Sequence, residues 1–206
     1  MRGAPGGSAA HRRVAMRQAG QFPFSVYMAV AAGFVGLQVV ALLAMGQPPI
    51  CECGYITLWY GDPSGPQSSQ QLTDWYTFTH FVHGFVFYAL LWVLAPGMSF
   101  GLRFALVIGL EAGWEVIENT PYIIERYRQT ALARGYFGDS VINSGFDTVA
   151  VALAVFWARF MPVWSSVLAV IGLEVFLALM IRDNLVLNII QLIYPSDLIN
   201  TWQAGG

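Results

Sequence analysis

The sequence predicts an all-α, polytopic transmembrane helix bundle of about five spans with an external interfacial helix. The 206 residues are 56% hydrophobic and only 11% charged, whereas a soluble domain is about 25% charged. Mean hydropathy is +0.56. Apolar runs of about 20 residues recur along the chain, and a helix of that length crosses a hydrocarbon core of about 30 Å.

The first apolar run, residues 24–45, follows a stretch rich in Gly, Ala and Arg. Residues 1–21 lack the apolar content of a folded element, so we expect a disordered cytoplasmic tail. A cleaved signal peptide is the competing interpretation, but its apolar region would be only roughly 7 to 15 residues long. A retained anchor is therefore favoured, and residues 22–206 are expected to form a single transmembrane helical domain.

Four further spans are predicted after a loop at residues 46–73. This loop contains Glu52 and Asp62 but no Lys or Arg, which by the positive-inside tendency makes it periplasmic. The amino terminus is then cytoplasmic, and the protein is predicted to be a multi-pass protein of the bacterial inner membrane. Prolines after two of the apolar runs mark helix ends. The predicted spans are about 74–95, 100–118, 139–160 and 163–181.

Two shorter segments are expected on the outer side of the membrane, one an interfacial or re-entrant segment and the other a helix on the membrane surface. Residues 185–194 are apolar but too few to cross the bilayer. Between the third and fourth spans, Thr120 can cap a helix, Pro121 suits its first turn and Gly135 can end it. Arginines on this side either hold anionic lipid head groups or bind an anionic substrate. The substrate-binding candidates are Arg126, Arg128 and Arg182.

Polar side chains form one stripe on each of three predicted spans. Such groups are costly in lipid, so they indicate a functional site by default. They recur at helical spacing, which places each set on one helix face. Counted from the periplasmic ends, the three stripes cover the same depths, from the surface to about 14 Å. We therefore expect one pocket beneath the outer leaflet, formed by His80 and His83, by Glu111, Glu115 and Glu118, and by Asp139, Asn143 and Asp147.

The carboxyl groups of these stripes cannot all be ionised and unpaired in lipid. Shared protons, a protonated imidazole, an arginine from the outer segment or a bound cation could balance them. Imidazole with carboxylate suits zinc, iron or manganese. The predicted metal ligands are His80, His83, Glu115 and Asp147, and the residues predicted to act in catalysis are Glu111, Glu115, Glu118, Asp139 and Asn143.

Two classes of function fit this pocket. The first is a metal-dependent hydrolase or transferase that acts on a lipid or lipid-linked substrate. The alternative is a proton or cation carrier, or a non-catalytic component that docks another membrane protein. A third interpretation is that the polar groups only hydrogen-bond helix to helix. No basic run indicates a nucleic-acid partner. Cys51 and Cys53 are compatible with a redox role, with a metal-binding role and with a chance pairing in the sequence.

Several motifs resemble those of bacterial VanZ-like membrane proteins and, more closely, an uncharacterised inner-membrane family of unknown function. The closer likeness runs over most of the chain after the first span, and it implies no particular reaction. The chain departs from the VanZ-like pattern because it lacks the Asp-Lys pair ahead of its His and the Asn-x-x-Gly turn of its later helix. The matching residues are His83-Gly84, the stripe Glu111-x-x-Trp-Glu115-x-x-Glu118-Asn119, Gly138 to Ser140 with Asn143 and Asp147, and Arg182-Asp183-Asn184.

Overall fold

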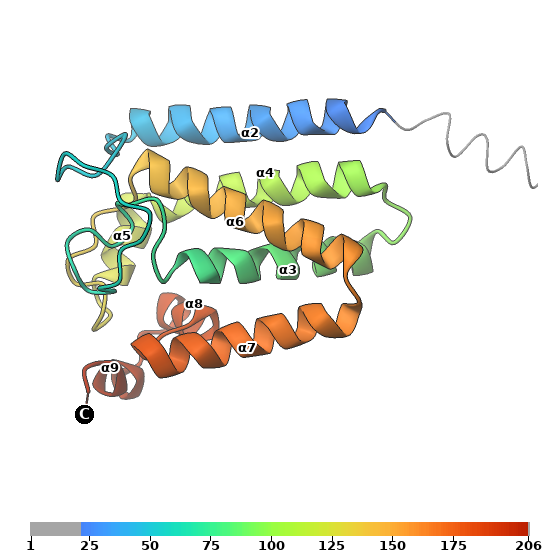
Figure 1. Cartoon of the computed structure of the whole chain (residues 1–206). Coiled ribbons are helices and arrows are strands. Elements are labelled where there is room, and N and C mark those ends of the chain that lie inside the picture. Colours follow the sequence, from blue (N-terminus) through green and yellow to red (C-terminus); the bar gives the residue numbers. More distant parts are fainter. Residues whose placement is uncertain (1–21, 206) are drawn as a thin grey trace, which may run out of the picture.

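The computed structural model describes residues 22–205, and these residues form eight helices and no strand (Figure 1). The predicted tail at residues 1–21 lies outside the described residues. The all-helical class is therefore confirmed. The helices are α2 (Phe24–Ala44), α3 (Thr77–Leu94), α4 (Phe100–Glu118), α5 (Pro121–Tyr127), α6 (Val141–Phe160), α7 (Val163–Ile181), α8 (Leu185–Ile193) and α9 (Asp197–Gln203).

Four helices, α2, α3, α6 and α7, are long and apolar enough to cross a membrane. The third predicted span, α4, has a similar length of 19 residues but carries four charged side chains. It packs against α2, α3 and α6, so neighbouring helices rather than lipid cover much of its polar face. The polar helix is thus the centre of the bundle. Its charged residues are Arg103, Glu111, Glu115 and Glu118.

Close helix packing depends on glycines at two crossings. A Cβ atom at Gly84 of α3 would lie 2.6 Å from the Ala154 Cβ and 2.6 Å from the Val151 carbonyl oxygen of α6. A Cβ at Gly109 of α4 would lie 3.0 Å from the ring of Phe34 in α2. Small residues are common where membrane helices approach closely, because they let the backbones come together. These two glycines therefore set the spacing of the bundle.

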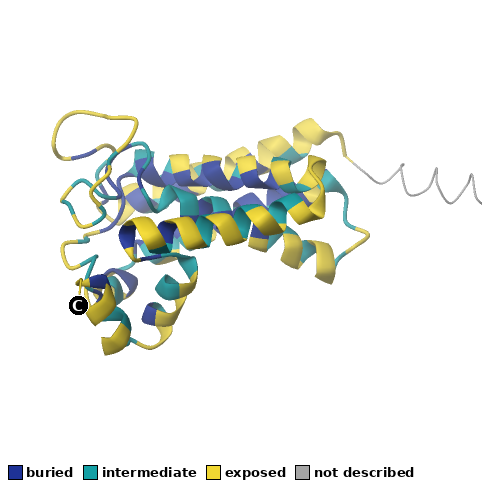
Figure 2. Cartoon of the chain, turned by 60° about the horizontal axis from the view of Figure 1, so that its bottom comes forward, coloured by how far each residue is buried: buried dark blue, intermediate teal, exposed yellow. Residues whose placement is uncertain are grey.

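The two ends of the bundle differ in chemistry. Where α2 enters the bundle, an apolar cluster of α2, α4 and α6 fills the interior. The loop after α2, together with α5, α8 and α9, gathers at the opposite, loop-rich end (Figure 1). Buried residues line the inward faces of the helices, and exposed ones cover their outer faces (Figure 2). The apolar cluster consists of Ala31, Phe104, Val107, Ile108, Val151 and Val155.

The loop after α2 holds the two cysteines of the chain, and the structure joins them in a disulfide between Cys51 and Cys53. The amide of the buried Gln71 lies within hydrogen-bonding distance of Cys53 Sγ, and its Oε1 accepts from the Thr57 N–H. Gln71 therefore connects the disulfide-bonded turn to the segment that leads into α3. The cysteines contact each other and not the histidines of the predicted pocket.

Two helices begin later than predicted, because a polar side chain just before each of them hydrogen-bonds to nearby backbone N–H groups. Asp74 precedes α3 and accepts hydrogen bonds from the N–H groups of Ser69 and Tyr76 instead of entering the helix. The hydroxyl of Ser140 accepts from the Asn143 N–H and caps α6. Both are favourable roles for short polar side chains at helix starts.

The outer helix α5 is shorter than predicted. It begins as expected, with Thr120 as its cap and a proline in its first turn, but it ends at Tyr127 and not near Gly135. The Ala131 N–H, which would continue the helix by bonding to the Tyr127 carbonyl, donates instead to Oδ1 of Asn200. The Thr130 hydroxyl donates a hydrogen bond to the Tyr127 carbonyl oxygen. A contact with the C-terminal segment therefore ends the helix early.

Replacing Gly84 by Ala should destabilise the bundle by about 1 to 3 kcal/mol, because the new methyl group collides with the backbone of α6. Thermal unfolding of the purified protein in detergent measures this effect. Gly113→Ala is the matched control, because nothing lies within 4 Å of a Cβ at that helical position. The control should be unchanged or slightly stabilised, because Ala favours a helix more than Gly does. Equal loss in both variants would show that the α3–α6 contact is not the cause.

Candidate functional site

One buried imidazole, His80, contacts carboxylates of two other helices. Its Nδ1 atom lies 2.6 Å from Oε1 of Glu111 and 3.2 Å from Oε1 of Glu115, both on α4. Its Nε2 atom lies 4.0 Å from Oε2 of Glu118 and 4.0 Å from Oδ2 of Asp147 on α6. The structure thus brings residues of all three predicted stripes around a single ring.

His83 lies one turn further along α3. Its Nδ1 is 3.3 Å from Oε2 of Glu111, so this carboxylate faces both histidines. The His83 ring stacks on Phe87 and meets the Trp114 ring edge to face. The aromatic neighbours fix the orientation of His83 and leave its nitrogens facing the polar site.

Several polar atoms of the site lack hydrogen-bond partners among the described residues. Buried polar atoms are almost always paired, since an unpaired one costs about 1 to 3 kcal/mol. Within residues 22–205, no arginine lies within ion-pair distance of the site carboxylates; the arginine–carboxylate pair found there joins Arg128 to Glu125. The site therefore has room for a cation or water. The atoms without a well-formed hydrogen bond are Nδ1 of His83, Oε2 of Glu111, Oε1 of Glu115, Oε2 of Glu118 and Oδ1 of Asp147. The first two lie 3.3 Å from each other, and Oε1 of Glu115 lies 3.2 Å from Nδ1 of His80.

Two sets of these residues could hold a metal ion, because their ligand atoms lie within 4.8 Å of one another. One set is His80, His83 and Glu111; the other is His80, Glu115 and Glu118. The geometry thus adds Glu111 and Glu118, which we assigned to catalysis, to the possible ligands. Asp147 approaches the His80 ring no closer than 4.0 Å, so it stands at the edge of the site.

A chain of hydrogen bonds from α6 and α2 holds the Glu115 side chain in place. The Ser144 hydroxyl of α6 donates to Oε2 of Glu115. The amide nitrogen of Gln38 on α2 donates to that hydroxyl at 2.8 Å, and Thr148 donates to Oε1 of Gln38 at 3.1 Å. All four side chains are buried. The orientation of Glu115 is therefore set by two neighbouring helices.

Asp139 and Asn143, two predicted site residues, lie further from the histidines. Asp139 accepts from the side-chain amide of Asn119 at 2.7 Å and from the hydroxyl of Tyr136 at 3.0 Å. Asn143 donates to the backbone carbonyl of Gln71 at 2.8 Å. Asn143 thus ties the loop before α3 to α6, and its contacts are with backbone and not with the imidazoles.

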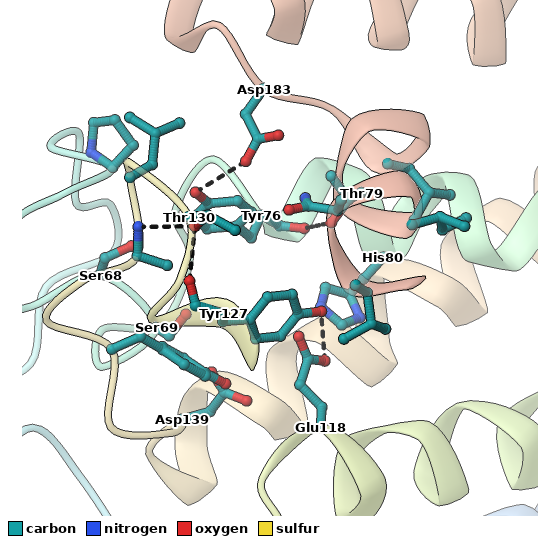
Figure 3. Close-up of a pocket in the computed structure, with 18 of the residues that line it drawn as sticks. Ser68, Ser69, Tyr76, Thr79, His80, Glu118, Tyr127, Thr130, Asp139 and Asp183 are labelled. Atoms are coloured by element: carbon teal, nitrogen blue, oxygen red, sulfur yellow. Dashed lines mark hydrogen bonds and ion pairs between the residues drawn. The ribbon is translucent and has the colours of Figure 1, made fainter. Parts of the chain in front are cut away.

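A cavity of about 420 Å³ opens beside His80 (Figure 3). Its polar wall includes the hydroxyls of Tyr76 and Tyr127, which hydrogen-bond to Asp183 and Glu118 respectively. Its other wall is apolar. The cavity is therefore amphiphilic, with the apolar lining supplied by Val86 and Phe87 of α3, Val170 of α7, and Val186, Ile189 and Leu192 of α8.

The three arginines predicted to bind substrate lie outside this cavity lining. Arg126 donates to the carbonyls of Leu192 and Ile193, at the end of α8. Arg128 donates to the Tyr136 carbonyl, and Arg182 to the Trp202 carbonyl. All three therefore contact backbone at the surface, and their role in binding an anionic substrate stays a prediction.

Comparison with known proteins identifies the family of this chain. Residues 42–205 match the family described as "Protein of unknown function (DUF2585)". The chain belongs to this family. A UPF0314 protein of Agrobacterium fabrum is 47% identical over 177 residues, which cover 86% of this chain and 89% of that protein. A UPF0314 protein of Sphingopyxis alaskensis is 45% identical over 86% of this chain and 94% of its own length.

A third relative, a UPF0314 protein of Paracoccus denitrificans, is 46% identical over 82% of this chain and 88% of its own length. The resemblance to an uncharacterised bacterial family of unknown function is thus confirmed. The VanZ-like relationship is not shown by these matches and stays a prediction. No solved structure matches the chain.

Several polar residues that support this site of the DUF2585 member were missed in the sequence. Gln38 is a lone amide in an otherwise apolar span, and that signal alone could have marked it. Tyr76, Tyr127 and Tyr136 were not identified, because tyrosine is common at membrane interfaces for reasons unrelated to a site. Their place in the cavity wall depends on how α3, α5 and the following loop meet.

Asp183, which follows α7 and lines the cavity, is also buried. Burial raises its pKa to about 7, although Asn184 N–H and the Tyr76 hydroxyl hydrogen-bond to it. The folded protein therefore retains a proton that the unfolded chain releases near the ordinary pKa of 3.8. Consequently, Asp183 lowers the stability of the fold progressively as the pH rises from about 4 to about 7.

Asp183→Asn should remove this pH dependence. Relative to the wild type, its free energy of unfolding should rise by about 1 to 3 kcal/mol between about pH 5 and about pH 8, because the wild type alone must ionise a buried carboxyl. Chemical unfolding at several pH values measures the difference. Glu52→Gln, in the exposed loop, is the control and should follow the wild type. A constant offset for Asp183→Asn would contradict the prediction.

Proposed function

We propose that this protein is a metal-dependent hydrolase or transferase that acts on a lipid or lipid-linked substrate. The observation that carries the proposal is the ring of buried, unpaired carboxylate oxygens around His80, next to an amphiphilic cavity. A polar site that needed only to join helices would pair its own atoms. Of the residues with such oxygens, Glu118 lines the cavity together with His80 and His83, and the cavity is large enough for part of a lipid.

A divalent ion fits the donor set. Imidazole and carboxylate suit zinc, iron or manganese, and when bound such an ion polarises a substrate oxygen or makes water acidic enough to attack. We assign ligation to His80, Glu115 and Glu118, with Asp147 and His83 at the edge of the site. Glu111 holds Nδ1 of His80 by a hydrogen bond, which leaves Nε2 facing Glu118 and Asp147. A carboxylate behind a ligating imidazole is a common way to orient it.

The alternative, a proton or cation carrier, requires polar groups through the whole membrane thickness. Beyond Thr148 the interior consists of the apolar cluster that includes Val107, Val151 and Val155. Arg103, at the far end of α4, donates to the Tyr88 hydroxyl and the Ala95 carbonyl, away from the site. A site open at one end of the bundle therefore favours the enzyme over the carrier. Docking of another membrane protein stays the remaining alternative.

We further propose that the loop-rich end faces the periplasm, so that the chain lies in the inner membrane with a cytoplasmic amino terminus. Disulfides persist in oxidising compartments, and Cys51–Cys53 lies at this end. Within the described residues, Arg103 and Arg159 lie at the opposite end and four arginines lie at the loop-rich end, so the orientation rests on the disulfide and not on these arginines. The candidate site is then reached from the outer leaflet.

Purified protein should contain about one zinc, iron or manganese ion per chain by elemental analysis. His80→Ala and Glu118→Gln should lose it, because each removes a ligand atom. Glu111→Gln should weaken binding by about 10- to 100-fold, since it disturbs the orientation of His80. Glu125→Gln, an exposed carboxylate outside the site, is the control and should keep the metal.

The same variants test the reaction. A strain without the gene should accumulate an amphiphilic substrate in its lipid profile, and the wild type and Glu125→Gln should restore the profile while His80→Ala should not. Metal-free protein from cells supplied with all three metals, together with an unchanged lipid profile after deletion, would overturn the proposal.

Orientation can be tested with single cysteines at opposite ends. Leu58→Cys in the exposed loop should react with a membrane-impermeant maleimide in cells whose outer membrane has been permeabilised. Gly97→Cys, in the exposed turn between α3 and α4, should react only after lysis. Labelling in the reverse pattern would place the site on the cytoplasmic side. The disulfide-bonded wild type gives the background.

A further inference from the structure

We infer that the cavity binds an amphiphile whose headgroup is cationic, an amine or a quaternary ammonium. This inference rests on the proposed function and names its substrate class. The reason is the charge of the cavity wall. Four carboxylates line it, and no Lys or Arg is among its lining residues. These acidic residues are Glu118, Asp139, Glu174 and Asp183.

A bound metal ion does not reverse this charge. Two positive charges offset only part of the carboxylates around His80, and Asp139 and Asp183 lie outside that set. Three of the four arginines at this end, Arg126, Arg128 and Arg182, contact backbone carbonyls, and none of the four lines the cavity. An isolated phosphate headgroup would therefore meet like charge, which opposes binding, whereas an ammonium group meets opposite charge.

Aromatic rings add a second feature typical of ammonium recognition. Tyr76, Tyr127 and Tyr136 line the polar half of the cavity, and Trp114 lines it near His83. The rings of Tyr127 and Tyr136 lie 5.6 Å apart at 82° to each other. These two rings pack edge to face, so a cation would lie against an open ring face and not between them; ring faces attract ammonium groups. Carboxylates and tyrosines together therefore suit a cation better than a neutral sugar or a phosphate.

An unpaired buried atom points to a ligand independently of the acidic wall. His83 is only 9% exposed and lines the cavity, and its Nδ1 makes no well-formed hydrogen bond among the described residues, although Oε2 of Glu111 lies 3.3 Å away. The Ser68 hydroxyl, on the opposite wall, is buried and unpaired as well. Both can accept a hydrogen bond from an amine. A protonated amine could therefore satisfy atoms that the protein leaves unpaired.

The apolar half of the cavity reaches the outer surface of the bundle. Val86 and Ile189 line it and are each 47% exposed. Beside them, α7 buries only Leu177 and Ile181, both near the loop-rich end, so it covers α3 incompletely along most of its length. An acyl chain can thus lie along this wall and extend into the surrounding lipid while the headgroup stays beside Tyr127.

The test compares three probes of equal chain length, decyltrimethylammonium, decyl phosphate and decyl maltoside. Each is titrated calorimetrically below its critical micelle concentration, at about pH 8, into the full-length protein in lipid nanodiscs, and empty nanodiscs supply the background. The ammonium probe should bind at least about tenfold more tightly than the other two. Asp183→Asn should reduce its affinity about tenfold, because one charged contact is lost. Glu125→Gln, outside the cavity, should have no effect.

A second pair of variants separates binding from folding. Tyr127→Leu should weaken the ammonium probe and leave the maltoside unchanged, and Tyr127→Phe should retain most ammonium binding because the ring remains. Equal affinities for all three probes, or a preference for decyl phosphate, would overturn the inference. Elemental analysis of the same samples tests the proposed function separately. If metal is bound but the ammonium probe is not preferred, only the inference about the headgroup is refuted. If the ammonium probe is preferred but no metal is bound, only the metal-dependent reaction is refuted.

Discussion

The constraint on which this structure depends is the burial, complete or nearly so, of four carboxyl groups and two imidazoles, with no arginine of residues 22–205 within ion-pair distance of them. In a low-dielectric interior such groups are tolerated only when partners surround them. His80 provides the common partner, since its two nitrogens face opposite pairs of acids. Its position in α3 thereby determines how α3, α4 and α6 must be aligned.

The supporting contacts show how this alignment is maintained. Ser144 and Gln38 hold Glu115 from behind, and Asn119 and Asp139 join the end of α4 to the start of α6. The loop that leads into α3 is fixed by the buried Gln70, whose amide donates to the Gly138 carbonyl. The polar end of the bundle is thus a network in which segments far apart in sequence fix one another. Its rigidity suits a site that orients reacting groups.

The C-terminal segment completes the cavity because side chains of α7 and α5 hydrogen-bond to backbone groups at the two ends of α8. Glu174 of α7 accepts from the N–H groups of Leu185 and Val186 at the start of α8. Arg126 of α5 donates to the carbonyls at its end. An acid at the amino end and a base at the carboxyl end both complement the helix dipole. A nine-residue helix too short to persist alone is therefore held as a wall of the cavity.

The sequence by itself determined the class of the fold and the kinds of residue at its polar end. Apolar runs of fixed length mark membrane helices because lipid permits no exposed backbone, and acids at helical spacing in such runs stand out because lipid makes them costly. Reasoning from local sequence alone therefore singled out His80, His83, Glu111, Glu115 and Asp147 without knowledge of their neighbours in the fold. It also placed most helix boundaries within a few residues.

Only the tertiary structure decided which partners these residues have. Helical spacing assigns a face to each side chain, but it does not say that Glu111 contacts both histidines or that Asn143 binds a loop backbone. The early end of α5 and the use of Arg126 on α8 depend on contacts between residues more than 60 positions apart. Because such contacts are fixed by packing and not by local propensity, no periodicity in the sequence encodes them. The cavity has the same origin, since its walls come from five helices and three connecting segments that meet only in the folded chain.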